Sequence, residues 1–270
     1  GFRKDYSAVD NIFTLLSLVQ KQLSSGQKPC AAFIDFKKAF DLVDRTYLWA
    51  VLRKNGIQGN MYRAIRSMYN VVKARVRANN EVTDAFICPR GLKQGDNCSP
   101  VLFSLFINEL ANDIAECGKH GISLSPDLIQ ILIMLFADDV VLLSNTVIGL
   151  QRQLDILCST AARLNLLVNY DKSKIIIFRN GGHIASKEKW LYDGVQLEIV
   201  NKYKYLGMTF STGMTFSYAL EEIALKAKKG VFSILKFLWS LGENCPRLFF
   251  KLFDSQIQPI LTYGSEVWGL

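Results

Sequence analysis

The feature that most constrains the fold of this chain is a long apolar run that contains two acidic residues. The run covers residues 131–143 and is broken only by two adjacent carboxylates, Asp138 and Asp139. Residues 128–137 and 140–143 are rich in Ile, Leu and Val, so they predict two buried β-strands joined by a tight turn at the acidic pair. The run is too short to span a bilayer. The sequence therefore predicts a buried hairpin whose turn carries two charges.

The acidic pair needs a physical explanation because like charges repel. A single Asp in a turn commonly binds the backbone, but two carboxylates about 4 Å apart repel by roughly 4 kcal/mol at an effective dielectric of about 20. A third carboxylate, Asp35, follows residues 30–34, which predict a short buried strand. Oxygen ligands favour magnesium or manganese over zinc. Such a cluster suits in-line nucleotidyl transfer, although the spacing alone also fits purely structural turns.

Composition narrows the class of partner. The 270 residues carry 32 Lys and Arg against 24 Asp and Glu, a net charge of +8, and half of them are hydrophobic. Such a chain can bury a core, and its basic balance fits nucleic acid or an anionic membrane surface. The Cys residues form no C-x-x-C pair and the two His lie apart from them. We therefore expect reduced thiols in a soluble intracellular protein, and no zinc site.

Hydrophobic periodicity predicts a mixed α/β body followed by helices. Helices are expected over residues 9–25, 47–55, 60–69 and 147–164, and after an N-cap and first-turn proline at Ser99-Pro100. Strands are expected over 71–78 and 81–88, joined by Asn79-Asn80, over 175–178, and on both sides of Asp193-Gly194.

Charge is patterned along two of these elements. Arg75 and Arg77 alternate with Val76, which places two cations on one face of the first hairpin. From about Thr215 onward only helices are expected, and these are richest in Lys at positions 226, 228, 229 and 236. Both clusters are candidate nucleic-acid contacts, or merely solvated faces.

Three ordered motifs resemble the reverse transcriptases of non-LTR retrotransposons (LINE-type elements). Residues 33–41 read FIDFKKAFD, similar to the first catalytic motif, in which an aromatic follows the Asp by five residues. Residues 90–95, RGLKQG, together with Ser99-Pro100 resemble the second motif. Residues 136–139, FADD, resemble the third motif in the form typical of this branch.

The resemblance continues along the whole chain. Residues 169–173, NYDKS, resemble the motif around a conserved lysine. Tyr205, Leu206 and Gly207 resemble the primer-grip hairpin, which supports the primer terminus; an ordinary hairpin is the alternative. Gly1-Phe2-Arg3 with Ser7 resembles the start of an upstream fingers motif, and residues 263–268 resemble the segment that closes the thumb.

The resemblance implies an α+β right-hand polymerase fold, with a ferredoxin-like palm, partial fingers and the start of a helical thumb. Residues 1–212 would form the fingers and palm, and residues 213–270 the thumb region. One departure is Asn165-Leu166, where the family commonly has Gly-Leu; Asn also tolerates a left-handed helix cap. Basic strands that precede Gly1 in the family are missing, so we expect a segment of a longer polypeptide that binds primer–template weakly.

The resemblance also assigns a catalytic site. Asp35 and Asp138 are expected to bridge two Mg²⁺ ions, with Mn²⁺ as a substitute, and Asp139 to support the ion on the primer side. The backbone carbonyl of Phe36 is expected to be a further ligand. Lys172 would protonate the pyrophosphate leaving group or bind the triphosphate, whereas a lysine after a turn otherwise faces solvent.

Four further residues are expected to bind the nucleotide. Phe40 would exclude a 2′-hydroxyl by bulk, which makes the product DNA; otherwise it is a core residue. Gln94 and Gly95 would line the pocket, since glycine allows close approach, or would form a plain loop. Arg90 belongs to the same motif.

The implied activity is RNA-directed DNA synthesis during retrotransposition, in the cytoplasm and nucleus. Its partners would be an RNA template, a DNA primer and deoxynucleoside triphosphates, with no membrane. An RNA-dependent RNA polymerase is disfavoured because such enzymes usually place Gly before the Asp pair and a polar residue where Phe40 stands. A group II intron maturase and a domesticated, non-catalytic RNA-binding protein remain as alternatives, although loss of a metal ligand would have supported the latter.

Overall fold

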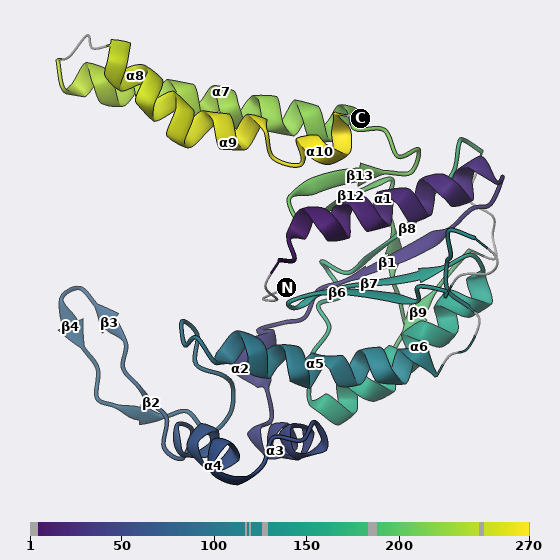
Figure 1. Ribbon diagram of the computed structural model, residues 1–270, viewed down its shortest axis with the longest axis vertical. Helices are drawn as coiled ribbons and strands as arrows, with labels where there is room; N and C mark the ends of the chain where they lie inside the picture. Colours follow the sequence, from purple (N-terminus) through teal and green to yellow (C-terminus); the bar gives the residue numbers. More distant parts are fainter. Residues whose placement is uncertain are drawn as a thin grey trace.

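The computed structural model describes residues 5–116, 118, 120–125, 129–182, 188–242 and 246–269. At its centre lies a five-stranded sheet in the order β11-β8-β1-β7-β6 (Figure 1). Its strands are β1 (Cys30–Ile34), β6 (Ile133–Phe136), β7 (Asp139–Ser144), β8 (Lys174–Ile177) and β11 (Glu198–Ile199). Strand β1 is antiparallel to β7 and β8, and β6 is antiparallel to β7. The strand that ends before Asp35 is therefore central.

Two hydrophobic clusters cover the two faces of this sheet, because successive strand residues point to opposite sides. Ala32 and Ile34 face α5 (Ser99–Ala115) and α6 (Val147–Leu164). Ala31 and Phe33 face α1 (Ala8–Ser24) and the hairpin of β12 (Lys202–Tyr205) and β13 (Met208–Ser211). Figure 1 shows the same layers. Burial on both faces holds β1 rigidly in place.

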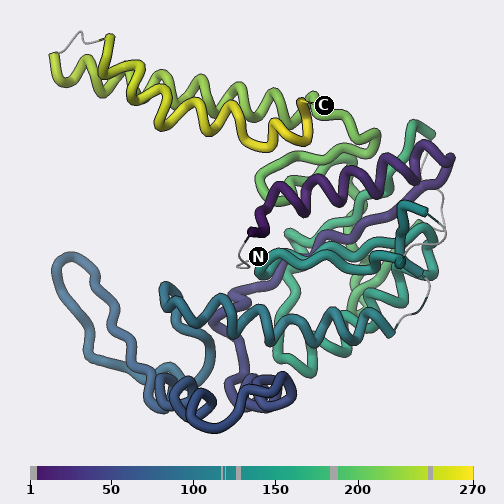
Figure 2. Tube along the Cα trace, viewed as in Figure 1, coloured from purple at the N-terminus to yellow at the C-terminus, as the bar shows by residue number. Residues whose placement is uncertain are grey.

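Two arms project from this body on the same side, so that the trace is C-shaped (Figure 2). The first follows short helices and carries two small ladders, β2 with β5 and β3 with β4. We call residues 71–90 the hairpin arm. The elements from the end of β1 to the arm are α2 (Ala39–Leu42), α3 (Arg45–Lys54), α4 (Gly59–Ser67), β2 (Lys73–Ala74), β3 (Arg77–Ala78), β4 (Glu81–Val82) and β5 (Phe86–Ile87).

The second arm is helical and has its own small core. Buried Ala227, Ile234, Leu238 and Ile257 hold α7 against the returning helices. Its elements are α7 (Ser217–Ser240), α8 (Pro246–Leu252), a π-helical turn η1 (Phe253–Ile257), α9 (Gln258–Leu261) and α10 (Ser265–Trp268). No helix among the residues described is both long and apolar enough to cross a membrane.

Most elements expected from the periodicity are confirmed. Helix α6 matches residues 147–164, and Asn165 ends it in the left-handed conformation at φ +56°. The hairpin around Asp193-Gly194 is β9 (Leu191–Tyr192) with β10 (Val195–Gln196). Asn79 and Asn80 both have positive φ, as a tight hairpin turn requires.

Two local expectations are wrong. Ser99 does not cap α5: it is the first helical residue, no side chain caps the helix, and its hydroxyl lies 3.1 Å from that of Tyr69. The strand expected over 128–137 shortens to β6, because Ile131 pairs instead with Ile122 outside the sheet. The first hairpin forms as expected, with a gap between its two ladders. Residues Gly1-Phe2-Arg3, Cys117, His183 and Cys245 lie outside the described residues.

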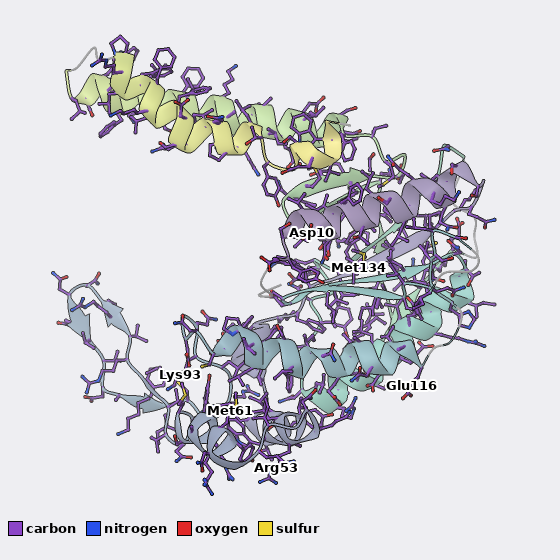
Figure 3. The ribbon with its side chains drawn as sticks, in the orientation of Figure 1. Asp10, Arg53, Met61, Lys93, Glu116 and Met134 are labelled. Atoms are coloured by element: carbon purple, nitrogen blue, oxygen red, sulfur yellow. The ribbon has the colours of Figure 1, made fainter. Side chains whose placement is uncertain are left out.

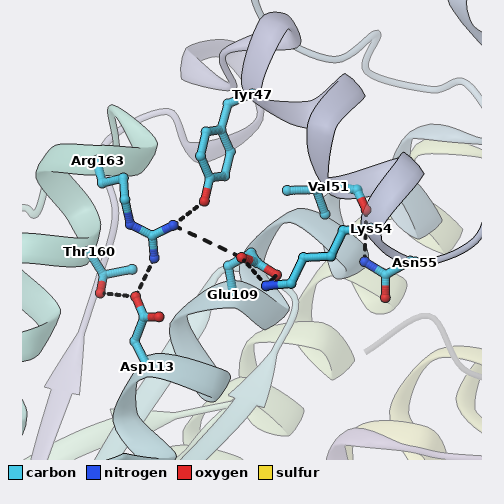
Figure 4. Close-up of polar contacts among 8 residues, drawn as sticks. All are labelled: Tyr47, Val51, Lys54, Asn55, Glu109, Asp113, Thr160 and Arg163. Atoms are coloured by element: carbon cyan, nitrogen blue, oxygen red, sulfur yellow. Dashed lines mark hydrogen bonds and ion pairs between the residues drawn. The ribbon is translucent and has the colours of Figure 1, made fainter.

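A network of hydrogen bonds and ion pairs joins α3, α5 and α6 (Figure 4). The carboxylate of Glu109, which is 5% exposed, accepts two hydrogen bonds of 2.9 Å from Lys54 Nζ. Arg163 pairs with Asp113, whose carboxylate also accepts a 2.6 Å hydrogen bond from Thr160. Because Glu109 is buried, its charge depends on these cations.

We expect Glu109→Gln to lower the midpoint of denaturant unfolding without changing its slope. The amide keeps the shape of the side chain but removes the negative charge that pairs with Lys54. The folded state should therefore lose stability, while the surface exposed on unfolding, which sets the slope, should not change. The matched control is Glu116→Gln at the exposed end of the same helix (Figure 3). Equal midpoints for the two variants would show that the network does not stabilise the fold.

Candidate active site

The three acidic residues meet at one edge of the sheet. Phe136 pairs with Asp139, so Ala137 and Asp138 alone form the turn between β6 and β7. Ile34 pairs with Val140, so the residues beside them, Asp35 and Asp139, lie at the same edge. The expectation that the Asp pair itself forms the turn is therefore wrong by one residue, and Asp139 begins β7.

The turn holds Ala137 in an unfavourable backbone conformation. Its φ is +54°, and a left-handed conformation costs an L residue with a side chain roughly 1–2 kcal/mol. Positive φ at the first of two turn residues matches the twist of a tight hairpin. The geometry of the hairpin thus presents Asp138 at its tip.

The acidic edge is electrostatically strained. Burial, together with the negative charges of Asp138 and Asp35, raises the pKa of the Asp139 carboxyl to about 6. The cation of Lys172 acts in the opposite direction. A raised carboxyl pKa shows that the charged form lacks sufficient compensation at this edge.

The donor set fits a hard divalent cation, although the side chains do not form a closed cage. Within the described residues, no group of three or more His, Cys, Asp or Glu side chains is arranged to hold a metal. The charges of Asp35 and Asp138 nevertheless act on the Asp139 carboxyl and raise its pKa. Their oxygens are of the type that magnesium prefers, and repulsion among them would be relieved by a cation.

Asp35 is oriented by the segment that follows α6. Its backbone N–H donates to Ser173 Oγ at 3.1 Å, and Asn169 Nδ2 donates to Asp35 Oδ2 at 3.1 Å. Lys172 Nζ lies 3.7 Å from the same oxygen. The sequence motif at 169–173 marked this segment, but only the structure shows that Asn169 binds the carboxylate and that Ser173 binds the backbone of Asp35.

Tyr203 is a neighbour of the site that sequence reasoning missed. Its ring stacks on Phe33 with centroids 4.5 Å apart. Burial and the charges of Asp139 and Asp35 raise the pKa of its hydroxyl to about 12. A tyrosine in β12 therefore lies within electrostatic reach of the acidic edge, and its position depends on strand pairing that no local pattern reveals.

A cleft of about 590 Å³ contains several of the residues expected to bind nucleotide. Phe40, Gln94 and Gly95 line it, and the ring of Phe40 stacks on Phe103 with centroids 4.3 Å apart. Arg90 is exposed and does not line this cleft. The structure thus brings three of the four predicted residues together.

Arg45 binds the loop of residues 88–91, which precedes the cleft residues in the sequence. Its guanidinium donates to the carbonyls of Gly91 at 2.8 Å, Cys88 at 3.0 Å and Arg90 at 3.1 Å. Gly91 has φ +85°, and a Cβ there would meet the Asp41 carbonyl oxygen at 2.6 Å. Sequence reasoning missed Arg45, since its partners are backbone carbonyls far along the chain. We infer that it positions Gln94 and Gly95.

We expect Arg45→Lys to raise the KM for nucleotide about tenfold while changing kcat less. An ammonium cannot span three carbonyls as a planar guanidinium does, so the loop should lose its fixed position. The control is Arg53→Lys on the same helix, whose guanidinium stacks on Tyr62 at 4.7 Å. Indistinguishable kinetics for the two variants, with melting temperatures equal to that of the unmodified chain, would contradict the positioning role.

The hairpin predicted as a primer grip packs against the end of the chain. Leu206 and Gly207 both have positive φ and form the turn between β12 and β13. Tyr205 is buried, and the Tyr263 hydroxyl donates to the carbonyl of Leu206. A Cβ at Gly207 would meet the Tyr263 ring at 3.2 Å. The C-terminal segment therefore supports this hairpin directly.

Comparison with known sequences identifies the family. Residues 1–210 match the family model described as reverse transcriptase (RNA-dependent DNA polymerase). The chain is 27% identical over 269 residues to the Pol polyprotein of the type-1 retrotransposable element R2 from Popillia japonica, covering 96% of this chain and 42% of that protein. It is 23% identical to the RNA-directed DNA polymerase of the mobile element jockey from Drosophila funebris, covering 29% of it.

Solved structures share the fold. A telomerase from Candida tropicalis, solved with a TWJ fragment of telomeric RNA, matches 96% of this chain and 41% of its own with a TM-score of 0.57 at 12% identity. A Candida albicans telomerase gives a TM-score of 0.52 at 14% identity over 97% of this chain. The chain spans less than half the length of these relatives. It belongs to the reverse transcriptase (RNA-dependent DNA polymerase) family, and the two relatives named above are proteins of non-LTR retrotransposons.

Proposed function

We propose that this chain is a polymerase core that copies an RNA template by adding deoxynucleotides to the 3′-hydroxyl of a primer. The observation that carries the proposal is the meeting of Asp35, Asp138 and Asp139 at one sheet edge. The nucleotide cleft begins at Phe40, which follows Asp35 closely in the same motif. Acidic edge and cleft together fit nucleotidyl transfer.

The acidic residues would hold the catalytic cations. Asp35 and Asp138 would bind both of two Mg²⁺ ions, or Mn²⁺ ions, with Asp139 and the Phe36 carbonyl as further ligands. Bound there, the cations would activate the attacking hydroxyl and neutralise charge on the pyrophosphate. Asn169 and Ser173 contribute by fixing Asp35, which keeps its carboxylate ready without a conformational search.

Each addition forms one bond and breaks one. The primer 3′-oxygen joins the α-phosphorus as the bond to the pyrophosphate oxygen breaks, and the hydroxyl proton is lost to solvent. Lys172 would supply a proton to the pyrophosphate or bind the triphosphate. Its side chain is 68% exposed and its Nζ lies 3.7 Å from Asp35, so it stands at the rim of the acidic edge.

The remaining surfaces would hold nucleic acid. Tyr205, Leu206 and Gly207 would support the primer terminus, with Tyr263 bracing them. We propose residues 1–212 as partial fingers and palm and 213–270 as part of the thumb, whose exposed lysines would contact duplex phosphates. In a longer protein, as in the relatives, further domains would add activities to this core.

Primer extension tests the proposal. The full chain, an RNA template and a labelled DNA primer are incubated with magnesium and either deoxynucleotides or ribonucleotides. We expect extension with deoxynucleotides only. Extension with ribonucleotides alone would indicate an RNA polymerase. RNA binding without any extension in magnesium or manganese would indicate a non-catalytic binding protein.

A further inference from the structure

The positive charge of this chain is concentrated in one segment. Residues 45–93 contain ten Lys and Arg but only Glu81 and Asp84 as acids, an excess of eight that equals the net charge of the whole chain. The rest of the sequence therefore carries as many acidic as basic residues. This segment comprises α3, α4 and the hairpin arm, so its field is centred on one end of the molecule.

Three of these cations occupy alternate positions in the hairpin arm: Lys73 begins β2, Arg77 begins β3, and Arg75 lies between the two strands. Lys73, Arg75 and Arg77 are exposed, and none makes an ion pair in the part of the chain that the structure describes. Alternate residues of an extended strand share a face and are spaced about 6.6 Å apart. That spacing is close to the separation of successive phosphates along an extended nucleic-acid strand. Charge and spacing together match a single-stranded backbone.

The opposite strand of the arm preserves this arrangement. Lys73 pairs with Ile87, and Arg77 pairs with Val82. Between the two ladders the first strand has two residues, 75 and 76, whereas the opposite strand has three, 83–85. The extra residue is therefore a bulge in the opposite strand and not in the strand that carries the cations. Ile87 and Val82 therefore share the cationic face and are 65% and 49% exposed. Apolar atoms beside cations suit sugars and bases as well as phosphates.

The position of the arm indicates which strand it would meet. The arm leads directly into Lys93, which lines the nucleotide cleft and donates to the Met68 carbonyl at the base of the arm. Figure 3 shows Lys93 at this junction, and Figure 1 shows the helical arm above the central sheet and the hairpin arm below it. A strand held by the hairpin arm would thus lie on the nucleotide side of the site, away from α7.

We propose that Lys73, Arg75 and Arg77 bind the sugar–phosphate backbone of the unpaired RNA template before it enters the active site. The inference rests on the proposed function for the identity of the strand, but not for the binding itself. The hairpin arm acts as a sequence-independent anchor, since phosphate contacts carry no base information. An anionic membrane is the competing partner, because the arm is also amphipathic.

Binding to hybrids with short and long template overhangs tests this anchor. The chain is titrated with labelled DNA primers on RNA templates whose unpaired 5′ ends differ in length, over a range of salt. For the long overhang, Arg75→Gln with Arg77→Gln should reduce the log–log salt slope by about 1.4, roughly 0.7 for each lost phosphate contact on a single strand. The short overhang cannot reach the arm and should show the unmodified slope.

The control neutralises two exposed cations elsewhere, Lys28 between α1 and β1 and Lys189 before β9. Lys28→Gln with Lys189→Gln should leave both slopes unchanged. The proposal would be overturned if the two double variants reduced the salt slope equally, or if the arm variant reduced it equally on short and long overhangs. So would an arm variant that loses affinity for phosphatidylserine vesicles but not for RNA. Primer extension by the unmodified chain, measured in parallel, separates failure of the anchor from failure of the polymerase assignment.

Discussion

Asp138→Asn is expected to abolish primer extension while RNA binding stays close to that of the unmodified chain. The substitution keeps the size of the side chain at the tip of the β6–β7 turn but removes its charge. A cation that stabilises the transition state by about 4 kcal/mol accounts for roughly a thousandfold in rate. The cations that we propose to bind phosphates on the two arms are untouched, so affinity for RNA should persist.

The measurement is single-turnover extension together with anisotropy of labelled RNA. Asp193→Asn is the matched control, because Asp193 also lies in a two-residue hairpin turn, at φ +50°, where Asn is well tolerated. The control should extend primers at the unmodified rate. An Asp138→Asn protein that folds and keeps a tenth of the activity would rule out this residue as an essential metal ligand.

The sequence predicted the acidic edge because its signals are local. A buried strand before Asp35 and an apolar run around Asp138 and Asp139 each follow from side-chain pattern, and strand pairing then needs only the usual antiparallel geometry. The left-handed cap at Asn165 was predictable for the same reason. Such features depend on neighbours within a few residues.

The supports of the site were not predictable because they join distant segments. Arg45 binds carbonyls more than forty positions along the chain, and Asn169 reaches Asp35 across 134 positions. Backbone carbonyls are present at every residue, so no residue type marks Arg45's partners. The one-residue error at the turn has a similar cause: the register of β6 against β7 puts Asp139 in the strand.

Phe40→Val is expected to weaken the preference for deoxynucleotides over ribonucleotides by at least roughly tenfold. The Phe40 ring lines the cleft and is backed by Phe103, so it cannot retreat from a 2′-hydroxyl. Removing part of a packed ring opens space for one small group, and a steric difference of that size is commonly about 1–3 kcal/mol. The measurement is the ratio of kcat/KM for the two nucleotides on one template.

Two further variants separate a steric gate from a core residue. Phe40→Tyr keeps the ring and should keep the discrimination. Phe106→Leu removes part of a fully buried ring on the same helix as Phe103, so it should lower stability without changing the preference for deoxynucleotides. If Phe40→Val instead behaves like Phe106→Leu, losing stability while its nucleotide ratio is unchanged, Phe40 belongs to the core and discrimination against the 2′-hydroxyl must arise elsewhere in the cleft. A gain in ribonucleotide use by Phe40→Val alone would place the sugar of the incoming nucleotide against this ring.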